Sequence, residues 1–246
     1  MATLDGKRML VVGASSGIGR ALSLLSAEGG ASVAVAARRR EQLESLVEHV
    51  GERARAFPCD VADATACERL VSEAAHWAGG LDAVVYAAGT APLARVDDLT
   101  AEQWRALLDV NVVGAAQVVR HALAHLRRSD SGSVALLSSH TVGTPWPWLA
   151  AYTASKAALA ELARGLRVEE PDVRVVCVTV GDTATGFAEA WDKELFGKVL
   201  PLWLDQGLLR HEIQQPGAVA ARIIETLFDR DGPTDVLVRG EPVSHA

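Results

Sequence analysis

Short apolar runs alternate with longer segments of helical periodicity along the chain. The short runs are rich in β-branched residues, and several are apolar throughout, as strands covered on both faces should be. The predicted strands are residues 9–12, 32–36, 55–57, 83–86, 133–137, 174–180 and 235–238. The predicted helices are residues 18–28, 40–50, 63–77, 101–126, 150–169 and 217–228. This alternation predicts an α/β fold with one doubly wound parallel sheet of about seven strands and helices on both faces.

One stretch interrupts this alternation. Residues 181–215 show no clear periodicity and contain Trp191, Pro201 and Trp203. A long irregular segment in a compact domain is typically a lid or binding loop, so we expect a substrate lid there. Because no repeat, low-complexity tract or linker divides the 246 residues, we predict one domain over residues 1–246.

Composition and charge narrow the classes of partner. Hydrophobic residues make up 49% of the chain and charged residues 22%, which is typical of a globular protein and excludes disorder and fibre. The 24 Lys and Arg against 31 Asp and Glu give a net charge of −7, so we expect neither nucleic acid nor an anionic membrane as partner. No apolar run approaches the roughly 20 residues that span a bilayer.

The cysteines and histidines indicate neither disulfides nor a metal. Cys59, Cys67 and Cys177 match no disulfide framework and no Cys-x-x-Cys pair. Together with the lack of a secretory signal in the first eight residues, they predict a reducing, cytoplasmic location. His121 and His125 have the spacing of a metal pair, but no third ligand is evident, so we expect surface histidines and no metal.

The first predicted strand ends in a glycine-rich turn, Gly13-Ala-Ser-Ser-Gly17-Ile-Gly19, and a helix follows directly. Glycines let the chain turn tightly and approach a pyrophosphate, and the free N–H groups at a helix start favour the anion. The spacing is Gly-x-x-x-Gly-x-Gly rather than the common Gly-x-Gly-x-x-Gly. Because strand, turn and helix occur in this order, the segment predicts dinucleotide binding.

Three arginines follow the second predicted strand, at Arg38, Arg39 and Arg40. NAD-selective sites place a carboxylate here, on the ribose 2′-hydroxyl, and NADP-selective sites place a cation on the 2′-phosphate. Cations are mildly unfavourable at a helix start, so three of them indicate a bound anion. We expect NADP(H) rather than NAD(H), with Arg38 as the principal 2′-phosphate partner.

The sequence Tyr152-Thr-Ala-Ser-Lys156 lies at the start of a predicted helix, so its tyrosine and lysine share one face. A nearby ammonium favours the phenolate and would lower the tyrosine pKa from its usual value near 10. Such a pair is a tunable proton donor. Ser139 closes the fifth predicted strand, at the edge of a parallel sheet where ligands of open α/β folds bind.

These motifs, over about residues 5 to 185, resemble the short-chain dehydrogenase/reductase family of the Tyr-x-x-x-Lys type. The resemblance implies a Rossmann-like fold and a catalytic set of Asn111, Ser139, Tyr152 and Lys156. It assigns an adenine contact to Asp60-Val61, and the cofactor-binding residues that we expect are Gly13, Ser15, Ser16, Gly17, Ile18, Gly19, Arg38, Arg39, Asp60, Val61, Ala88, Gly89, Tyr152, Lys156, Gly181, Thr183 and Thr185.

The resemblance also implies a mechanism. In the reduction direction Tyr152 donates a proton to a carbonyl oxygen as hydride leaves the nicotinamide, and Ser139 holds that oxygen. Lys156 lowers the tyrosine pKa and bonds the nicotinamide ribose. Asn111 anchors a water that links Lys156 to solvent.

Several positions depart from the family pattern. Val12 stands where a Thr is usual, Tyr86-Ala87-Ala88-Gly89 replaces Asn-Asn-Ala-Gly, and Val180-Gly181 replaces Pro-Gly. We interpret these as tolerated variants. The segment 236–242 lacks the Asp-Gly-Gly ending of many relatives, so a tetramer interface built on it is not expected.

Four tryptophans lie near the expected substrate. Trp146 and Trp148 stand between Ser139 and Tyr152, and Trp191 and Trp203 lie in the predicted lid. Either these loops pack their aromatics on each other, or the side chains line an apolar pocket. With the second reading, the expected substrate-binding residues are Ser139, Trp146, Trp148, Tyr152, Trp191 and Trp203.

The sequence therefore predicts an NADP(H)-dependent oxidoreductase that interconverts a hydrophobic ketone and a secondary alcohol. A 3-oxoacyl-thioester or polyketide ketoreductase is an alternative within this class. An isomerase or dehydratase that uses the same residues, and a regulatory NADP-binding protein without chemistry, are further alternatives. The resemblance implies a homodimer or homotetramer that packs through the helices at 101–126 and 150–169.

Overall fold

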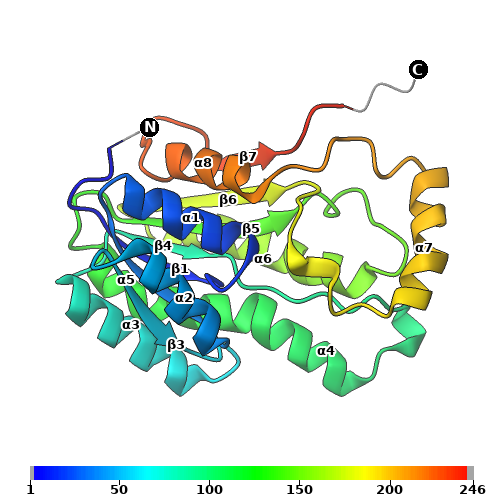
Figure 1. The fold of residues 1–246 in the computed structure, drawn as a ribbon, viewed down its shortest axis with the longest axis horizontal. Helices are drawn as coiled ribbons and strands as arrows, with labels where there is room; N and C mark the ends of the chain where they lie inside the picture. The colour runs from blue at the N-terminus through cyan, green and yellow to red at the C-terminus, as the bar shows by residue number, and fades with distance from the viewer. Residues whose placement is uncertain (1–2, 243–246) are drawn as a thin grey trace.

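Seven parallel strands form one sheet in the order β3-β2-β1-β4-β5-β6-β7 (Figure 1). The computed structural model describes residues 3–242. Residues 1–2 and 243–246 of the predicted domain lie outside the described residues. The strands are β1 (Arg8–Val12), β2 (Ser32–Ala37), β3 (Ala54–Pro58), β4 (Ala83–Tyr86), β5 (Ser133–Ser139), β6 (Arg174–Val180) and β7 (Asp235–Val238). The predicted doubly wound α/β fold is confirmed.

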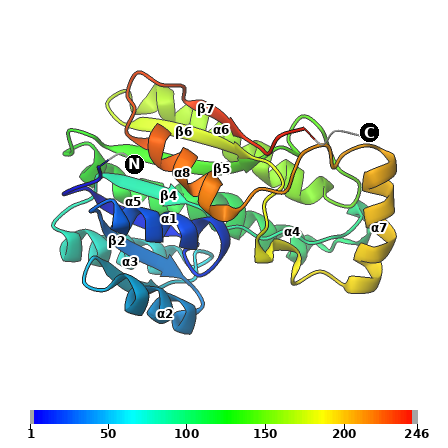
Figure 2. The ribbon, with the colours of Figure 1, turned by 45° about the horizontal axis from the view of Figure 1, so that its top comes forward.

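The α-helices cover both faces of the sheet, as Figure 2 shows. They are α1 (Gly17–Glu28), α2 (Arg40–Val50), α3 (Ala64–Ala78), α4 (Ala101–Leu108), α5 (Gly114–Leu126), α6 (Ala150–Glu169), α7 (Lys193–Asp205) and α8 (Pro216–Leu227). Side chains of α1, α2 and α8 pack on one face, and side chains of α3, α5 and α6 pack on the other. None of the helices within residues 3–242 has the length and apolar character that crossing a membrane requires.

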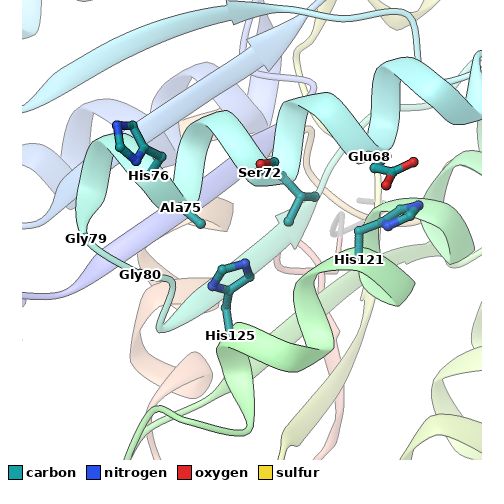
Figure 3. A pocket seen from close by; sticks show the side chains of 9 residues that line it. Glu68, Ser72, Ala75, His76, Gly79, Gly80, His121 and His125 are labelled. Carbon is teal, nitrogen blue, oxygen red and sulfur yellow. The ribbon is translucent and has the colours of Figure 1, made fainter.

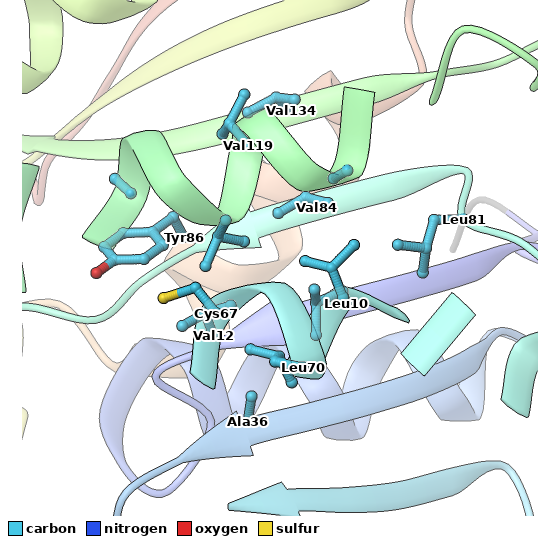
Figure 4. Packing of buried hydrophobic residues seen from close by; sticks show 14 of the residues in the cluster. Leu10, Val12, Ala36, Cys67, Leu70, Leu81, Val84, Tyr86, Val119 and Val134 are labelled. Carbon is cyan, nitrogen blue, oxygen red and sulfur yellow. The ribbon is translucent and has the colours of Figure 1, made fainter. Parts of the chain in front are cut away.

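Alternating strand residues supply the two cores. Leu10 and Val84 point into the α3/α5/α6 core (Figure 4), whereas Met9 and Val85 point into the α1/α2/α8 core. Because both faces of each central strand are buried, its middle residues form an apolar run, which is why the strands could be predicted. Cys67 lies in the first of these cores and is fully buried.

The predicted continuous helix at 101–126 is wrong in its middle. A π-helical segment, η2 (Asp109–Val113), separates α4 from α5. The hydroxyl of Tyr86 donates to the carbonyl oxygen of Val110 over 2.6 Å, and a Cβ on Gly114 would lie 2.8 Å from that hydroxyl. The wider π-helical turn therefore allows this segment to pack against Tyr86 at the end of β4. Asn111, within the turn, is fully buried.

The expected irregular stretch at 181–215 also contains regular structure. After a short 3₁₀ turn, η3 (Gly186–Ala188), the carboxylate of Asp192 accepts a hydrogen bond from the backbone N–H of Leu195 and caps α7. Helix α7 lies at one end of the molecule, beyond the sheet (Figure 1). It contains Pro201, which obscured the helix in the sequence pattern.

At the opposite edge of the sheet from the carboxyl ends of the strands, Arg8 and Asp82 tie β1 to β4. The Arg8 Nη2 lies 2.7 Å from Asp82 Oδ1, and the hydroxyl of Ser129 donates to the same oxygen over 2.6 Å. Burial opposes the charge of Asp82, but the hydrogen bonds from Arg8 and Ser129 outweigh it and lower the pKa of Asp82 to about 2.

We predict that Asp82→Asn destabilises the fold by about 2 kcal/mol at pH 7. An acid whose folded-state pKa lies below its unfolded value of about 4 stabilises the fold above that pH and loses the contribution as the pH falls toward 2. Urea unfolding between pH 7 and pH 2.5 should therefore show that the difference in the free energy of unfolding between wild type and Asp82→Asn shrinks as the pH falls. Asp172→Asn, at an exposed position, is the control. A difference in unfolding free energy that does not change with pH would contradict the lowered pKa of Asp82.

Candidate active site

The glycine turn between β1 and α1 is folded tightly against the end of β4. Gly13 has φ +94°, and a Cβ there would lie 2.5 Å from the backbone nitrogen of Ala88. A Cβ on Gly19 would lie 2.3 Å from the carbonyl oxygen of Gly13. Ser16, the N-cap of α1, makes no side-chain cap hydrogen bond, which leaves the N–H groups of the first turn for an anion. This backbone cradle fits a dinucleotide pyrophosphate.

Arg39 lies over this turn. Its Nη2 donates to the hydroxyls of Ser15 and Ser16, over 3.0 and 2.7 Å. The side chain of Arg38 is exposed and makes no hydrogen bond or ion pair with the described residues. The structure therefore brings Arg39, rather than Arg38, into contact with the glycine turn.

Two further segments reach the same edge of the sheet. Asp60 and Val61 follow β3, where the Asp60 carboxylate accepts from the backbone N–H of Ala62 over 3.1 Å. After β6, the hydroxyl of Thr183 donates to the carbonyl oxygen of Gly181 over 2.9 Å. The Thr185 methyl lies 3.0 Å from the position of a Cβ on Gly17, so it contacts the turn directly.

Lys156 joins helix α6 to strand β5. Its Nζ donates to the carbonyl oxygen of Leu137 over 2.8 Å, and the hydroxyl of Ser138 donates back to the carbonyl oxygen of Lys156 over 3.1 Å. Burial lowers the pKa of Lys156 to about 8, because the charged amine is removed from water.

Asn111 braces the beginning of α6 from the π-helical segment. Its amide donates to the carbonyl oxygen of Thr90 and to the hydroxyl of Ser155, and its oxygen accepts from the N–H of Thr90. The Ser155 hydroxyl donates in turn to the carbonyl oxygen of Tyr152 over 2.6 Å. A Cβ on Gly89 would lie 3.3 Å from Lys156 Nζ, so glycine leaves room there.

Tyr152 is buried beside Ser139 and below the lid. Burial raises the pKa of Tyr152 to about 12, and the neighbouring Ser139 hydroxyl opposes part of this shift. The lysine amine is bonded to Leu137 and lies 5.9 Å from the centre of the tyrosine ring, so the expected lowering of this pKa by Lys156 stays a prediction. Desolvation therefore dominates.

Ser139 ends β5 and faces Thr141. Its Oγ accepts hydrogen bonds from the backbone N–H of Thr141, over 3.2 Å, and from the Thr141 hydroxyl, over 3.1 Å. The next side chain, His140, turns elsewhere: its Nε2 lies 3.4 Å from a carboxylate oxygen of Asp182, and its ring packs on Trp146.

The predicted lid segment, residues 181–215, contacts the candidate site through aromatic side chains. Trp191 donates to the carbonyl oxygen of Ala91, and Trp203 donates to that of Pro147. Trp203 packs edge-on to Trp146 with ring centres 5.0 Å apart. All four expected tryptophans lie in or against one apolar cluster with Tyr152. We call its mutually contacting rings the aromatic cluster: Trp146, Tyr152, Phe187, Trp191 and Trp203.

Two residues change the expected picture of the substrate side. Trp148, at φ +70°, packs at the edge of the aromatic cluster and lines a shallow surface groove with Arg95. Phe187, which the sequence reasoning missed, lies with its ring centre 5.2 Å from that of Tyr152 and 5.6 Å from that of Trp191. The only signal in the sequence was an aromatic residue between Thr185 and Trp191.

The family profile described as short chain dehydrogenase matches residues 7–195. The chain belongs to this family. The chain is 33% identical over 200 residues to 11-beta-hydroxysteroid dehydrogenase-like 2 of Arabidopsis thaliana, and the match covers 79% of this chain and 65% of that protein. It is 32% identical over 187 residues to 2,3-dihydro-2,3-dihydroxybenzoate dehydrogenase of Bacillus subtilis, with 74% and 72% covered.

A solved structure gives the same result. A short-chain dehydrogenase from Streptomyces avermitilis superposes with a TM-score of 0.82 at 30% identity, over 94% of this chain and 88% of the other. The predicted family resemblance is therefore confirmed.

A further hollow lies away from this site. An open groove of about 470 Å³ lies between α3 and α5 (Figure 3). His121 and His125 of α5 line it together with Glu68 and His76 of α3. Within residues 3–242, no three His, Cys, Asp or Glu side chains are grouped so that they could hold a metal ion.

We predict that Gly13→Ala destabilises the fold by about 1–3 kcal/mol, because a side chain there has an unfavourable φ and meets the backbone of Ala88. Gly165→Ala is the matched control: Gly165 lies in α6 with no atom within 4 Å of a Cβ, so alanine should stabilise the helix by up to ~1 kcal/mol. Urea unfolding measures both. Equal changes in the free energy of unfolding for the two substitutions would contradict the close contact between Gly13 and the backbone of Ala88.

Proposed function

We propose that this short-chain dehydrogenase interconverts a hydrophobic ketone and its secondary alcohol, with NADP(H) as cofactor. The observation that carries the proposal is that Ser139, Tyr152 and Lys156 are all buried at the carboxyl end of β5, where the Ser139 hydroxyl neighbours that of Tyr152 and the Lys156 amine is bonded to the strand. Parallel α/β sheets bind their ligands at this edge.

NADP(H), when bound, supplies or accepts the hydride. The glycine turn would hold the pyrophosphate, Asp60 and Val61 the adenine, and Gly181, Thr183 and Thr185 the nicotinamide end. The remaining proposed contacts are Ile18, Ala88 and Gly89. The 2′-phosphate would lie between Arg38 and Arg39, where Ser15 and Ser16 already hold one guanidinium.

We assign each of the four proposed catalytic residues a part in the transfer of a proton to the carbonyl oxygen. With its pKa raised to about 12, Tyr152 is protonated at neutral pH and can donate to the carbonyl oxygen of a ketone. Ser139 donates a hydrogen bond to the same oxygen as charge develops on it. Lys156, largely protonated at neutral pH with its pKa of about 8, lies one helical turn away and can return a proton. Asn111 holds the backbone at Tyr152 through Ser155.

The substrate side favours a hydrophobic molecule. Phe187 packs on Tyr152 and Trp191 packs on Phe187. Trp203 packs on Trp191 and Trp146, and both Trp203 and Trp146 are buried. Aromatic walls with few polar groups bind flat apolar compounds well. The names of the two relatives, for a hydroxysteroid and a dihydroxybenzoate, support a cyclic carbon skeleton. One domain, a cytoplasmic location and a homodimer or homotetramer stay predictions.

We predict that Tyr152→Phe lowers kcat for ketone reduction by at least about 100-fold, because the proton donor is removed. NADPH binding, followed by its fluorescence, should stay within about twofold of wild type. His49→Gln, at an exposed position in the last turn of α2, is the control. Near-normal kcat in Tyr152→Phe would refute the assignment.

We predict that the double variant Arg38→Ser/Arg39→Ser raises KM for NADPH by about 10- to 100-fold, as expected for lost charge-assisted hydrogen bonds to a phosphate. KM for NADH should change little, because NADH carries no 2′-phosphate. The single variants separate the two arginines, and Arg128→Ser, at an exposed position after α5, is the control. Wild-type enzyme that uses NADH as well as NADPH would contradict the preference.

A further inference from the structure

The hydroxyl of Ser139 is held by one neighbouring residue. Thr141 donates to the Ser139 Oγ twice, from its backbone N–H over 3.2 Å and from its hydroxyl over 3.1 Å. Thr141 is 3% exposed and Ser139 is 5% exposed, so water does not compete for these bonds. The backbone of Val142 closes the turn by donating to the carbonyl oxygen of Ser139 over 3.0 Å.

These two bonds determine which hydrogen bonds the Ser139 hydroxyl can still make. A serine hydroxyl has two acceptor positions and one proton. The Thr141 N–H and hydroxyl fill both acceptor positions, so the proton is the group that remains, and it points away from Thr141. An oxygen that accepts two hydrogen bonds is polarised and becomes a stronger donor itself. A site that stabilises developing negative charge needs such a donor.

We infer that Thr141 is a positioning residue, whose hydroxyl aims the Ser139 proton at the oxygen of the reacting carbonyl or alcohol. The inference rests on the proposed function. In the reduction direction the bond from Ser139 strengthens as the carbonyl oxygen gains charge, while the proton that is transferred comes from Tyr152. No atom leaves Thr141, which acts only through Ser139.

The surroundings leave this role to Thr141. The imidazole of His140, the residue between them, faces the carboxylate of Asp182 and the ring of Trp146, so it makes no bond to the serine. Ser138 donates to the carbonyl oxygen of Lys156 on the other side of the strand. In the described chain, Ser139 Oγ accepts no side-chain hydrogen bond besides that of Thr141.

Thr141→Val keeps the shape and the backbone N–H but removes the hydroxyl. We expect kcat for ketone reduction to fall about fivefold, the effect of one hydrogen bond of about 1 kcal/mol, with KM for NADPH unchanged. Thr141→Ser restores the donor and should restore kcat. Thr141→Ala removes the hydroxyl without a branched side chain, and it replaces Thr141→Val if that variant does not fold. Failure of the serine variant to restore kcat would overturn the inference.

A double-mutant cycle separates positioning from a structural effect. Ser139→Ala alone should lower kcat about 100-fold. Because Thr141 acts through Ser139, adding Thr141→Val to Ser139→Ala should change kcat by less than about twofold. Multiplication of the two effects, to about 500-fold, would show that Thr141 acts independently and would overturn the inference.

A second readout does not need turnover. The chain has two tyrosines, so the protein labelled at the tyrosine Cζ gives two carbon signals, and Tyr152→Phe assigns them. With NADP⁺ present, the Tyr152 signal should begin its alkaline shift at a higher pH in Thr141→Val than in wild type, because the aimed serine proton favours the phenolate. If the pH at which the Tyr152 signal begins to shift is the same in both proteins, the inference about Thr141 is overturned. Inactivity of the wild-type protein on every ketone would refute the proposed function, and this measurement would still test the role of Thr141.

Discussion

The contact between strand β5 and helix α6 is the constraint on which the candidate site depends. Lys156 donates to the carbonyl oxygen of Leu137, and Ser138 donates to the carbonyl oxygen of Lys156. These reciprocal bonds fix Ser139, at the end of the strand, relative to Tyr152, one turn earlier on the helix. They are buried, where a hydrogen bond is stronger and an unpaired partner would cost more. The proposed proton donor and its oxygen-binding partner are therefore held by the core rather than by flexible loops.

Burial also sets the protonation states of this pair of side chains. Removal from water lowers the pKa of Lys156 to about 8 and raises that of Tyr152 to about 12. Both groups then carry their protons near neutral pH, the state that a proton donor for ketone reduction requires. Phe187 contributes to this burial, because its ring centre lies 5.2 Å from that of Tyr152. In the proposed function, the segment 181–215 would therefore link the substrate side to the proton chemistry.

The sequence predicted the sheet, because strands buried on both faces contain apolar runs, and it predicted the glycine turn through its context between strand and helix. It did not predict η2, since one wider turn hardly alters the apolar period of a long helix. Helix α7 was missed because Pro201 interrupts its pattern and its apolar side chains pack on loops instead of the sheet. Phe187 and the direction of the Tyr152 pKa shift depend on distances that only folding creates.

The central claim is that the glycine turn and the buried Ser139, Tyr152 and Lys156 direct hydride from NADPH to the carbonyl carbon of a hydrophobic ketone. Deuterium at C4 of the nicotinamide tests this most directly, with the product alcohol examined by mass spectrometry and NMR. The account predicts that the alcohol carries deuterium on its carbinol carbon when one face of the nicotinamide is labelled and none when the other face is labelled. An alcohol without deuterium from either labelled cofactor would contradict it.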